Sequence, residues 1–304
     1  MKNYIYNNVR RLAIMAVPML AIAFSSCSEG DMDDQSIITV DHVDYTPFDH
    51  WLQRNYVAPY NIEFKYRYDD KESDMNYYTI PARYEASVIL AHIVKYACIE
   101  AYDEVGGINF TRRFFPKMIF TIGEWEYRNN GTFILGTAEG GRKILLSGTN
   151  YVEQYMGDAN DLNEYYLRTI HHEFTHILNQ TKDYPADYKL ITGSAYVADS
   201  WSEGSLATGF LERGFITNYA QHSDTEDFAE MLSMFVCNSE EQWNKWMEEA
   251  GETGAQLINS KLDMVKAYMQ TAFNIDIVKL RNAIQRRQKD ITAGRVNLTD
   301  LTVN

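Results

Sequence analysis

Hydrophobic positions recur with helical spacing in two long segments of the chain. Pro81 stands where a first helical residue belongs, and residues 82–102 are largely apolar, which is typical of a long buried helix. Residues 161–181 carry apolar side chains three and four positions apart, and Asp161 with Glu164 resembles a capping box at the start of that segment. The same period recurs in three later segments: 224–237, 254–273 and 276–289. We therefore expect several helices, with residues 182–304 mostly helical.

Shorter segments alternate between apolar and polar positions and predict strands. Residues 61–68 form the first, and three more candidates follow: 117–123, 132–137 and 143–148. Asn130-Gly131 and Gly140-Gly141 supply tight turns between the last three, so we expect an antiparallel meander.

The N-terminal residues have the pattern of an export signal. A basic start precedes the apolar run 12–24, and small residues then lead to Cys27. This resembles a bacterial lipobox, so residues 1–26 are interpreted as a lipoprotein signal peptide and Cys27 as the lipidated residue. An ordinary secretory signal is the alternative. Residues 27–40 are acidic and lack apolar periodicity, as expected of a flexible tether. Serine and acidic residues after Cys27 also resemble the surface-export signal of Bacteroidota lipoproteins.

Composition agrees with one folded domain over residues 41–304. The formal net charge is −14, and removal of Lys2, Arg10 and Arg11 with the signal makes it three units more negative. This acidity argues against nucleic acid or an anionic membrane surface as a partner. Beyond Cys27 only two cysteines remain, which indicates no disulfide framework.

The candidate chemistry lies in the helix predicted over residues 161–181. His172 and His176 are four apart and share a helix face, with Glu173 beside them. This is the H-E-x-x-H pattern, in which two imidazoles bind zinc and the glutamate accepts a proton from water. Histidines at the surface with no metal are the alternative. We expect His92 to be a core histidine, and His171 to pack or to support the site from outside the ligand set and not to be a ligand.

A catalytic zinc needs a third protein ligand, which must come from the residues after 181. Candidates from the sequence are Asp199, Glu203, Glu212, His222, Asp224, Glu226, Asp227 and Glu230. Glu226 and Glu230 share a face of the helix predicted over 224–237, an unusual pairing unless a cation lies nearby. One could bind the metal while the other orients a histidine; the alternative is a solvated acidic helix face.

Tyr219, Glu226 and Glu230 together resemble the gluzincins of the anthrax lethal factor and Pro-Pro endopeptidase type. In that group a tyrosine precedes an E-x-F-A-E helix. The resemblance implies that Glu226 is the third zinc ligand, that Glu230 supports a ligand histidine and that Tyr219 donates to the oxyanion. Glu230 and then His222 are the alternatives for the third ligand. Tyr196 and Trp201, between the two metal helices, are expected to be packing residues.

A wider resemblance covers nearly the whole mature chain. The lipobox and four segments (59–68, 172–180, 184–185 and 191–201) resemble the substrate import-associated zinc metallohydrolase lipoproteins, which are encoded beside SusC/SusD-type uptake pairs in Bacteroidota. The element order resembles a zincin-like peptidase. It implies an α+β fold, with a small, mainly antiparallel sheet and long helices in an upper lobe (41–181) and a helical lower lobe (182–304). In that architecture an edge strand pairs with extended substrate, and the candidate is 143–148.

These observations predict a zinc metallohydrolase, most simply a peptidase in which Glu173 is the general base. The resemblance implies an outer-membrane lipoprotein exposed at the cell surface, with peptide substrates and a SusC/SusD-type importer as a partner. Two alternatives stay open. One is a lipoprotein of the uptake complex that binds peptides or glycopeptides without cleaving them, against which the intact Glu173 speaks. The other is a zinc amidase or deacylase, because metal, base and oxyanion donor serve any acyl transfer.

Overall fold

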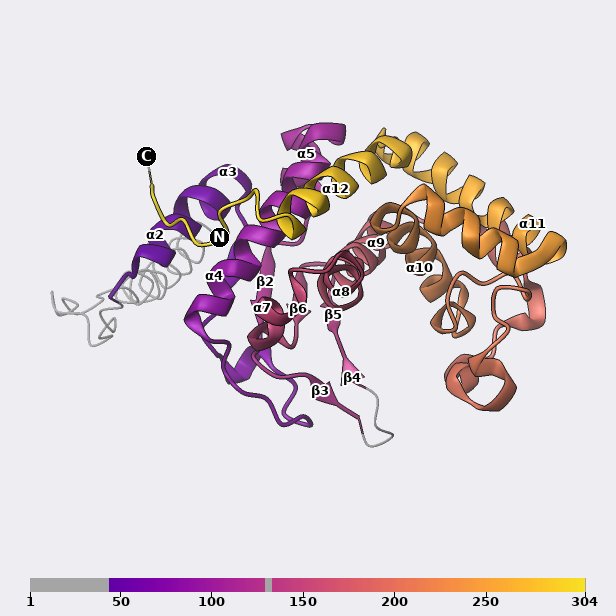
Figure 1. Cartoon of the computed structure of the whole chain (residues 1–304), viewed down its shortest axis with the longest axis horizontal. Helices are drawn as coiled ribbons and strands as arrows, with labels where there is room; N and C mark the ends of the chain where they lie inside the picture. Colours follow the sequence, from indigo (N-terminus) through magenta and orange to yellow (C-terminus); the bar gives the residue numbers. More distant parts are fainter. Residues whose placement is uncertain (1–43, 129–132, 304) are drawn as a thin grey trace, which may run out of the picture. The chain divides into compact units, whose positions relative to one another are not determined.

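In the computed structural model, which describes residues 44–128 and 133–303, the long apolar helix begins at Tyr84. It runs through α4 (Tyr84–Ile93), a π-helical segment (Val94–Ile99) and α5 (Glu100–Gly106) (Figure 1). Pro81 is not its first residue: it pairs with Ile122 in an isolated bridge, and Arg83, with extended backbone, is the N-cap. The predicted signal peptide, the tether and Cys27 lie outside the described residues.

Short elements surround this helix. Those before it are α2 (Pro47–Leu52), a π-helical segment (Gln53–Val57), α3 (Ala58–Tyr60), strand β1 (Glu63–Lys65) and a 3-10 turn (Asp70–Glu72). α6 (Ile108–Phe114) follows it, and after the strands come a 3-10 turn (Thr149–Tyr151) and α7 (Val152–Tyr155). α2 shows how the sequence sets a boundary, because Thr46 and Asp49 form a complete capping box and Pro47 is the first helical residue.

The principal sheet has the strand order β1-β2-β6-β5, with β2 (Met118–Thr121), β5 (Gly136–Glu139) and β6 (Lys143–Leu146). β1 and β6 both pair with β2 in parallel, and only β5 with β6 is antiparallel. β3 (Glu126–Tyr127) and β4 (Phe133–Ile134) form a separate antiparallel pair.

The α+β class is confirmed, but the predicted antiparallel meander is corrected. The segment 132–137 is divided between two sheets, and the Gly140-Gly141 turn joins β5 to β6 as the one hairpin in the principal sheet. The edge strands of this sheet are therefore β1 and β5. Residues 143–148, the candidate edge, contain β6, which pairs on both sides.

The helix that carries the H-E-x-x-H pattern is continuous through α8 (Ala159–Leu162), a π-helical segment (Asn163–Leu167) and α9 (Arg168–Thr181). Asp158 is its N-cap and accepts hydrogen bonds from the backbone of Asn160 and Asp161. The predicted capping box at Asp161 is therefore wrong, because Asp161 already lies in the first helical turn.

After α9 the chain makes 3-10 turns (186–190, 193–195, 198–202, 204–207 and Tyr219–Gln221). It then forms α10 (Asp224–Cys237), α11 (Glu240–Phe273), which is kinked at Gly251, and α12 (Ile277–Thr292). α9 packs against α10 and against β5, and α10 packs against α11 and α12 (Figure 1). None of the helices among the described residues is long and apolar enough to cross a membrane.

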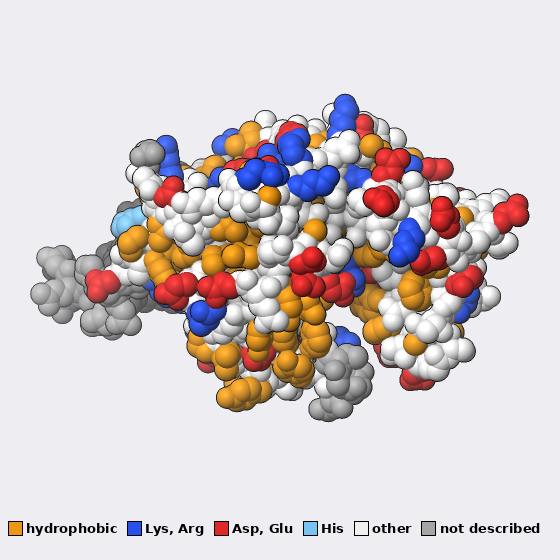
Figure 2. All heavy atoms as spheres, viewed as in Figure 1, with side chains coloured by type: hydrophobic (Ala, Val, Ile, Leu, Met, Phe, Trp, Pro, Cys, Tyr) orange, Lys and Arg blue, Asp and Glu red, His pale blue; other side chains and the backbone are white. Residues whose placement is uncertain are grey.

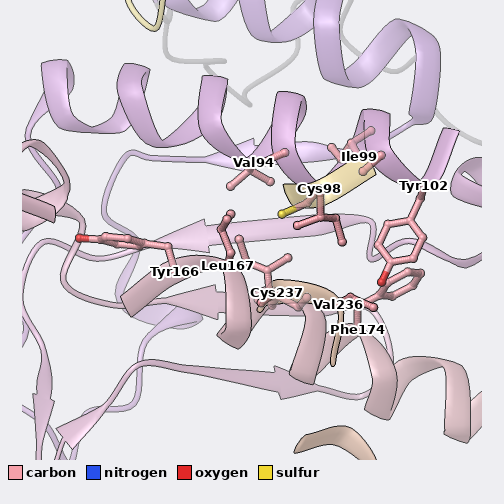
Figure 3. Packing of buried hydrophobic residues seen from close by; sticks show 14 of the residues in the cluster. Val94, Cys98, Ile99, Tyr102, Tyr166, Leu167, Phe174, Val236 and Cys237 are labelled. Carbon is pink, nitrogen blue, oxygen red and sulfur yellow. The ribbon is translucent and has the colours of Figure 1, made fainter. Parts of the chain in front are cut away.

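One buried core holds α9 and α10 in place. Val94, Cys98 and Tyr102 of the long apolar helix lie against Leu167 and Phe174 of the motif helix and against Cys237 of α10 (Figure 3). Both cysteines are buried and free. Because the three helices share this core, the relative position of α9 and α10 is set by packing, and so is the position of the side chains they present on the opposite side.

Candidate active site

α9 presents the two histidines of the motif from successive turns. The rings of His172 and His176 meet edge to face with centroids 4.7 Å apart, and their Nε2 atoms are 3.0 Å from one another. His172 is buried, and His176 is partly exposed. The helical spacing expected from the sequence therefore brings two imidazole nitrogens to one point.

α10 brings a carboxylate to the same point. Glu226 Oε2 lies 3.0 Å from His172 Nε2 and 3.2 Å from His176 Nε2. Glu226 sits in the first turn of α10, where its backbone N–H donates to the N-cap Ser223 Oγ. A carboxylate there is stabilised by the positive end of the helix dipole. Burial raises the pKa of Glu226, but the hydrogen bonds with the two histidines outweigh burial and hold this pKa well below its ordinary value.

Glu230, one turn further along α10, lies behind His172. Its Oε1 is 2.8 Å from His172 Nδ1, and its Oε2 accepts a hydrogen bond of 2.7 Å from Thr217 Oγ1. The carboxylate is only 2% exposed, and Arg168 Nε is 3.7 Å away. Burial raises the pKa of Glu230, but Arg168 and the His172 hydrogen bond lower it to about 2. An ionised Glu230 at this distance favours the His172 tautomer with its proton on Nδ1, which leaves the Nε2 lone pair free on the side of His176 and Glu226.

The three converging atoms fit a zinc ion. Tetrahedral zinc with bonds of ~2.0–2.1 Å to nitrogen and oxygen holds its ligand atoms about 3.3 Å apart, close to the spacing of 3.0–3.2 Å found here. Burial lowers the pKa of His172, but Glu226 and Glu230 raise it to about 10, so this position favours positive charge. Among the described residues, one group of at least three histidine, cysteine or acidic side chains could hold a metal ion. It consists of His172, His176 and Glu226.

Glu173 and Tyr219 face the same space from opposite elements. Both line a cavity of about 720 Å³ that also includes the three converging side chains. Burial raises the pKa of Glu173, while the two histidines and a hydrogen bond from the Ala138 backbone oppose that rise. Burial also raises the pKa of Tyr219, and the nearby carboxylates of Glu226, Glu230 and Glu173 act in the same direction. The cavity thus contains a carboxylate and a phenol beside the candidate metal position.

The comparisons with known proteins agree with this geometry. Residues 41–278 match the family described as "Putative zinc-binding metallo-peptidase". The chain belongs to this family. It is also similar to a crystal structure titled as a putative zinc-binding metallo-peptidase from Bacteroides caccae ATCC 43185. The two chains are 42% identical, with a TM-score of 0.72 over 85% of this chain and 99% of that one. None of the curated proteins matches this chain.

The cavity walls of this family member come from both sides of α9. One wall consists of β4, β5 and the residue between them, together with Arg128, and the other contains Trp201 and Asn218. The face in Figure 2 is indented at its lower margin between these two parts. Arg168 and Tyr165 line the end of the cavity on the motif helix. Because the edge strand β5 forms a wall, its backbone is within reach of anything bound there.

The other candidates for the third ligand lie elsewhere. Glu203 and Glu212 are exposed. His222 Nε2 lies 3.3 Å from the fully exposed Asp199, and Asp224 accepts a hydrogen bond from Tyr184. Asp227 points about 100° away from Glu226 around α10 and pairs with Lys261. The structure therefore brings only Glu226 and Glu230 of the eight candidates to the two histidines.

The remaining histidine predictions are confirmed. His171 is buried, and its Nδ1 lies 3.1 Å from the Tyr102 hydroxyl. His92 stacks on Trp51 with ring centroids 4.0 Å apart, and its ring nitrogens face two backbone carbonyls. Both are packing residues of the core.

Sequence reasoning missed three residues around the site. Trp201 was expected to be packing only, as Tyr196 is, but it lines the cavity and meets Tyr219 edge to face. Arg168 lies one helical turn before His172 and therefore on the same helix face. Its approach to Glu230 could have been predicted from this spacing once Glu230 was known to support His172. Thr217 has no sequence signal, since its contact with Glu230 depends on how the loop folds over α10.

Proposed function

We propose that this protein is a zinc-dependent peptidase. The observation that carries the proposal is the convergence of His172, His176 and Glu226 within 3.2 Å of one another, next to Glu173, in a cavity walled by the free edge of β5. Two imidazoles and one carboxylate, with room left for water, are the ligand set of a catalytic zinc. Membership of a family described as zinc-binding peptidases supports the same assignment.

The residues of the cavity have separate roles in this proposal. His172, His176 and Glu226 would hold the metal, and zinc bound there supplies a Lewis acid for water and for the scissile carbonyl. Glu173, which lines the cavity beside the histidines, accepts the proton of the attacking water and passes it to the leaving amine. Tyr219 donates its hydroxyl proton toward the developing oxyanion. Glu230 keeps His172 in the tautomer that directs Nε2 toward the metal.

The sheet favours a peptide as substrate. β5 is the end strand of its sheet and lines the cavity through residues 136–138. An extended peptide can pair with such an edge through its own backbone, which a small amide or acylated substrate cannot do. Gly136 keeps this strand close to the motif helix, because a Cβ there would lie 2.7 Å from Thr169 Cγ2 and 2.6 Å from Leu145 O.

The cellular setting is proposed from the sequence. Lipidation at Cys27 would anchor the domain to the outer membrane through the tether, and the acidic residues after it favour exposure at the cell surface. There it would cleave peptides beside a SusC/SusD-type importer. Protease treatment of intact cells tests the location: a surface protein is cut, and one that is protected until the cells are lysed faces inward.

Metal content is the deciding experiment. Mass spectrometry of residues 28–304 should find about one zinc per chain, as expected for one three-ligand site, and His176→Ala should lose it. A peptide library should then be cleaved by the wild-type protein and left intact by Glu173→Gln. If neither the wild-type protein nor His176→Ala holds zinc after zinc is supplied, the hydrolase assignment is wrong. A lipoprotein that binds peptides without cleaving them then becomes the better description.

A further inference from the structure

Thr217 joins the loop that carries Tyr219 to the carboxylate that supports His172. It is 7% exposed and lies two residues before the 3-10 turn Tyr219–Gln221. Its Oγ1 donates to Glu230 Oε2 at 2.7 Å and accepts from the Ala220 backbone N–H at 3.1 Å. One hydroxyl therefore uses both its donor and its acceptor capacity.

The contacts form a continuous path across the site. The Ala220 N–H in the Tyr219 turn bonds to Thr217, Thr217 bonds to Glu230, and the other oxygen of Glu230 faces His172 Nδ1 at 2.8 Å. The Tyr219 ring lies 6.1 Å from that of His172. Arg168 Nε, 3.7 Å from Oε1, competes for the carboxylate. Without the bond to Thr217, Glu230 can rotate toward Arg168 and away from His172.

We propose that Thr217 is a positioning residue that holds Glu230 against His172 and, through the same hydroxyl, holds the turn of Tyr219 over the metal position. The proposal rests on the proposed function, since it assigns Thr217 a role in metal binding and in transition-state stabilisation. It touches neither metal nor substrate itself. Outer partners of this kind change metal affinity by about 10–100-fold when removed.

Thr217→Val tests the proposal because valine keeps the shape and removes the hydroxyl. Thr217→Ser restores the hydroxyl. Thr111→Val is the matched control, because Thr111 is also buried and donates to a carboxylate, that of Asp103, away from the cavity. Zinc affinity is measured by chelator competition, the ligand geometry by the visible spectrum of the cobalt-substituted protein, and turnover with a peptide cleaved by the wild type.

Thr217→Val should lose about 10-fold or more in zinc affinity, change the cobalt spectrum, and lower kcat with little change in KM. Thr217→Ser should recover all three, and Thr111→Val should leave them unchanged. A Thr217→Val protein with wild-type affinity and spectrum overturns this inference alone, and so does an equal loss in Thr111→Val. A wild-type protein that binds no zinc overturns the proposed function and this inference together.

Discussion

Two neighbouring acidic residues of α10 have opposite surroundings. Glu226 faces two histidines across the cavity, and Asp227, about 100° further round the helix, faces Lys261 of α11. Lys261 Nζ lies 2.6 Å from Asp227 Oδ2, and both side chains are fully buried. Tyr196 donates a hydrogen bond to the same oxygen, and Lys261 also donates to the Gly214 carbonyl.

The difference teaches how a buried carboxylate is charge-balanced. Around Asp227 the chain supplies its own cation, which also lies 4.0 Å from the centre of the Phe215 ring, so the cluster is closed and structural. Among the residues that the structure describes, no lysine or arginine pairs with Glu226, and two imidazole nitrogens face its carboxylate instead. In the proposed function, a zinc ion bound by these three side chains supplies the cation of that cluster.

We call the group of His172, His176 and Glu226 the open cluster, and the group of Asp227 and Lys261 the closed cluster. Glu173→Gln, beside the open cluster, should give the largest loss of activity. The amide cannot accept the proton of water, so turnover should fall by ~10²–10⁴-fold while zinc stays bound, since Glu173 is not among the converging ligands. Peptide cleavage and metal content measured on the same preparation check this. A variant that keeps its rate removes Glu173 as the base.

Glu226→Ala and Glu230→Ala compare ligand and support within the open cluster. Loss of a ligand should nearly abolish zinc binding, whereas loss of the support should weaken it by about 10–100-fold. Consequently zinc at 100 times its Kd should stabilise the wild type by about 2.7 kcal/mol and Glu226→Ala not at all. Chelator competition and thermal melts measure both quantities. Equal losses in the two variants would contradict the assignment of Glu226 as the third ligand.

Lys261→Met tests the closed cluster. It leaves Asp227 buried without its cation, so the free energy of unfolding should fall by about 3–5 kcal/mol, while the folded fraction still binds zinc. Lys266→Met is the matched control on the same helix, because its partner Asp263 is exposed, and such pairs contribute ~1 kcal/mol or less. Urea unfolding of both variants measures the difference. Similar small losses would mean that Lys261 does not balance Asp227.

Asp49 offers a third, more accessible case, with Arg67 as its cation at 2.7 Å. Burial raises the pKa of Asp49, but Arg67 and Thr46 lower it to about 2. A depressed pKa contributes stability above the unfolded value near 4, and that stability is lost as the pH falls toward 2. Asp49→Asn should therefore cost about 1 kcal/mol at pH 7, a difference that shrinks between pH 4 and pH 2. Urea midpoints across this range check the sign.

Local periodicity explains what could be read without the fold. The spacing of His172 and His176 places both on one helix face whatever surrounds them, and the apolar stripe of residues 161–181 predicts the helix that carries them. The same reasoning placed Glu226 and Glu230 together on α10. Helix boundaries were less reliable, because Asp158 and Asp161 are both acceptable caps and only the observed backbone chooses between them.

Tertiary structure decided everything that joins distant segments. A period of 3.6 shows that Glu226 and Asp227 point in different directions, but only the packing of α10 between α9 and α11 determines which one meets the histidines and which one meets Lys261. Strand order is likewise non-local, so β5 and not β6 became the edge beside the cavity. Thr217 reaches Glu230 through a loop whose path depends on the whole core.

The sequence by itself determined the chemistry each element can offer, because that depends on residues within one or two helical turns. The fold decided which of those residues meet, because such contacts depend on the packing of segments far apart in the chain.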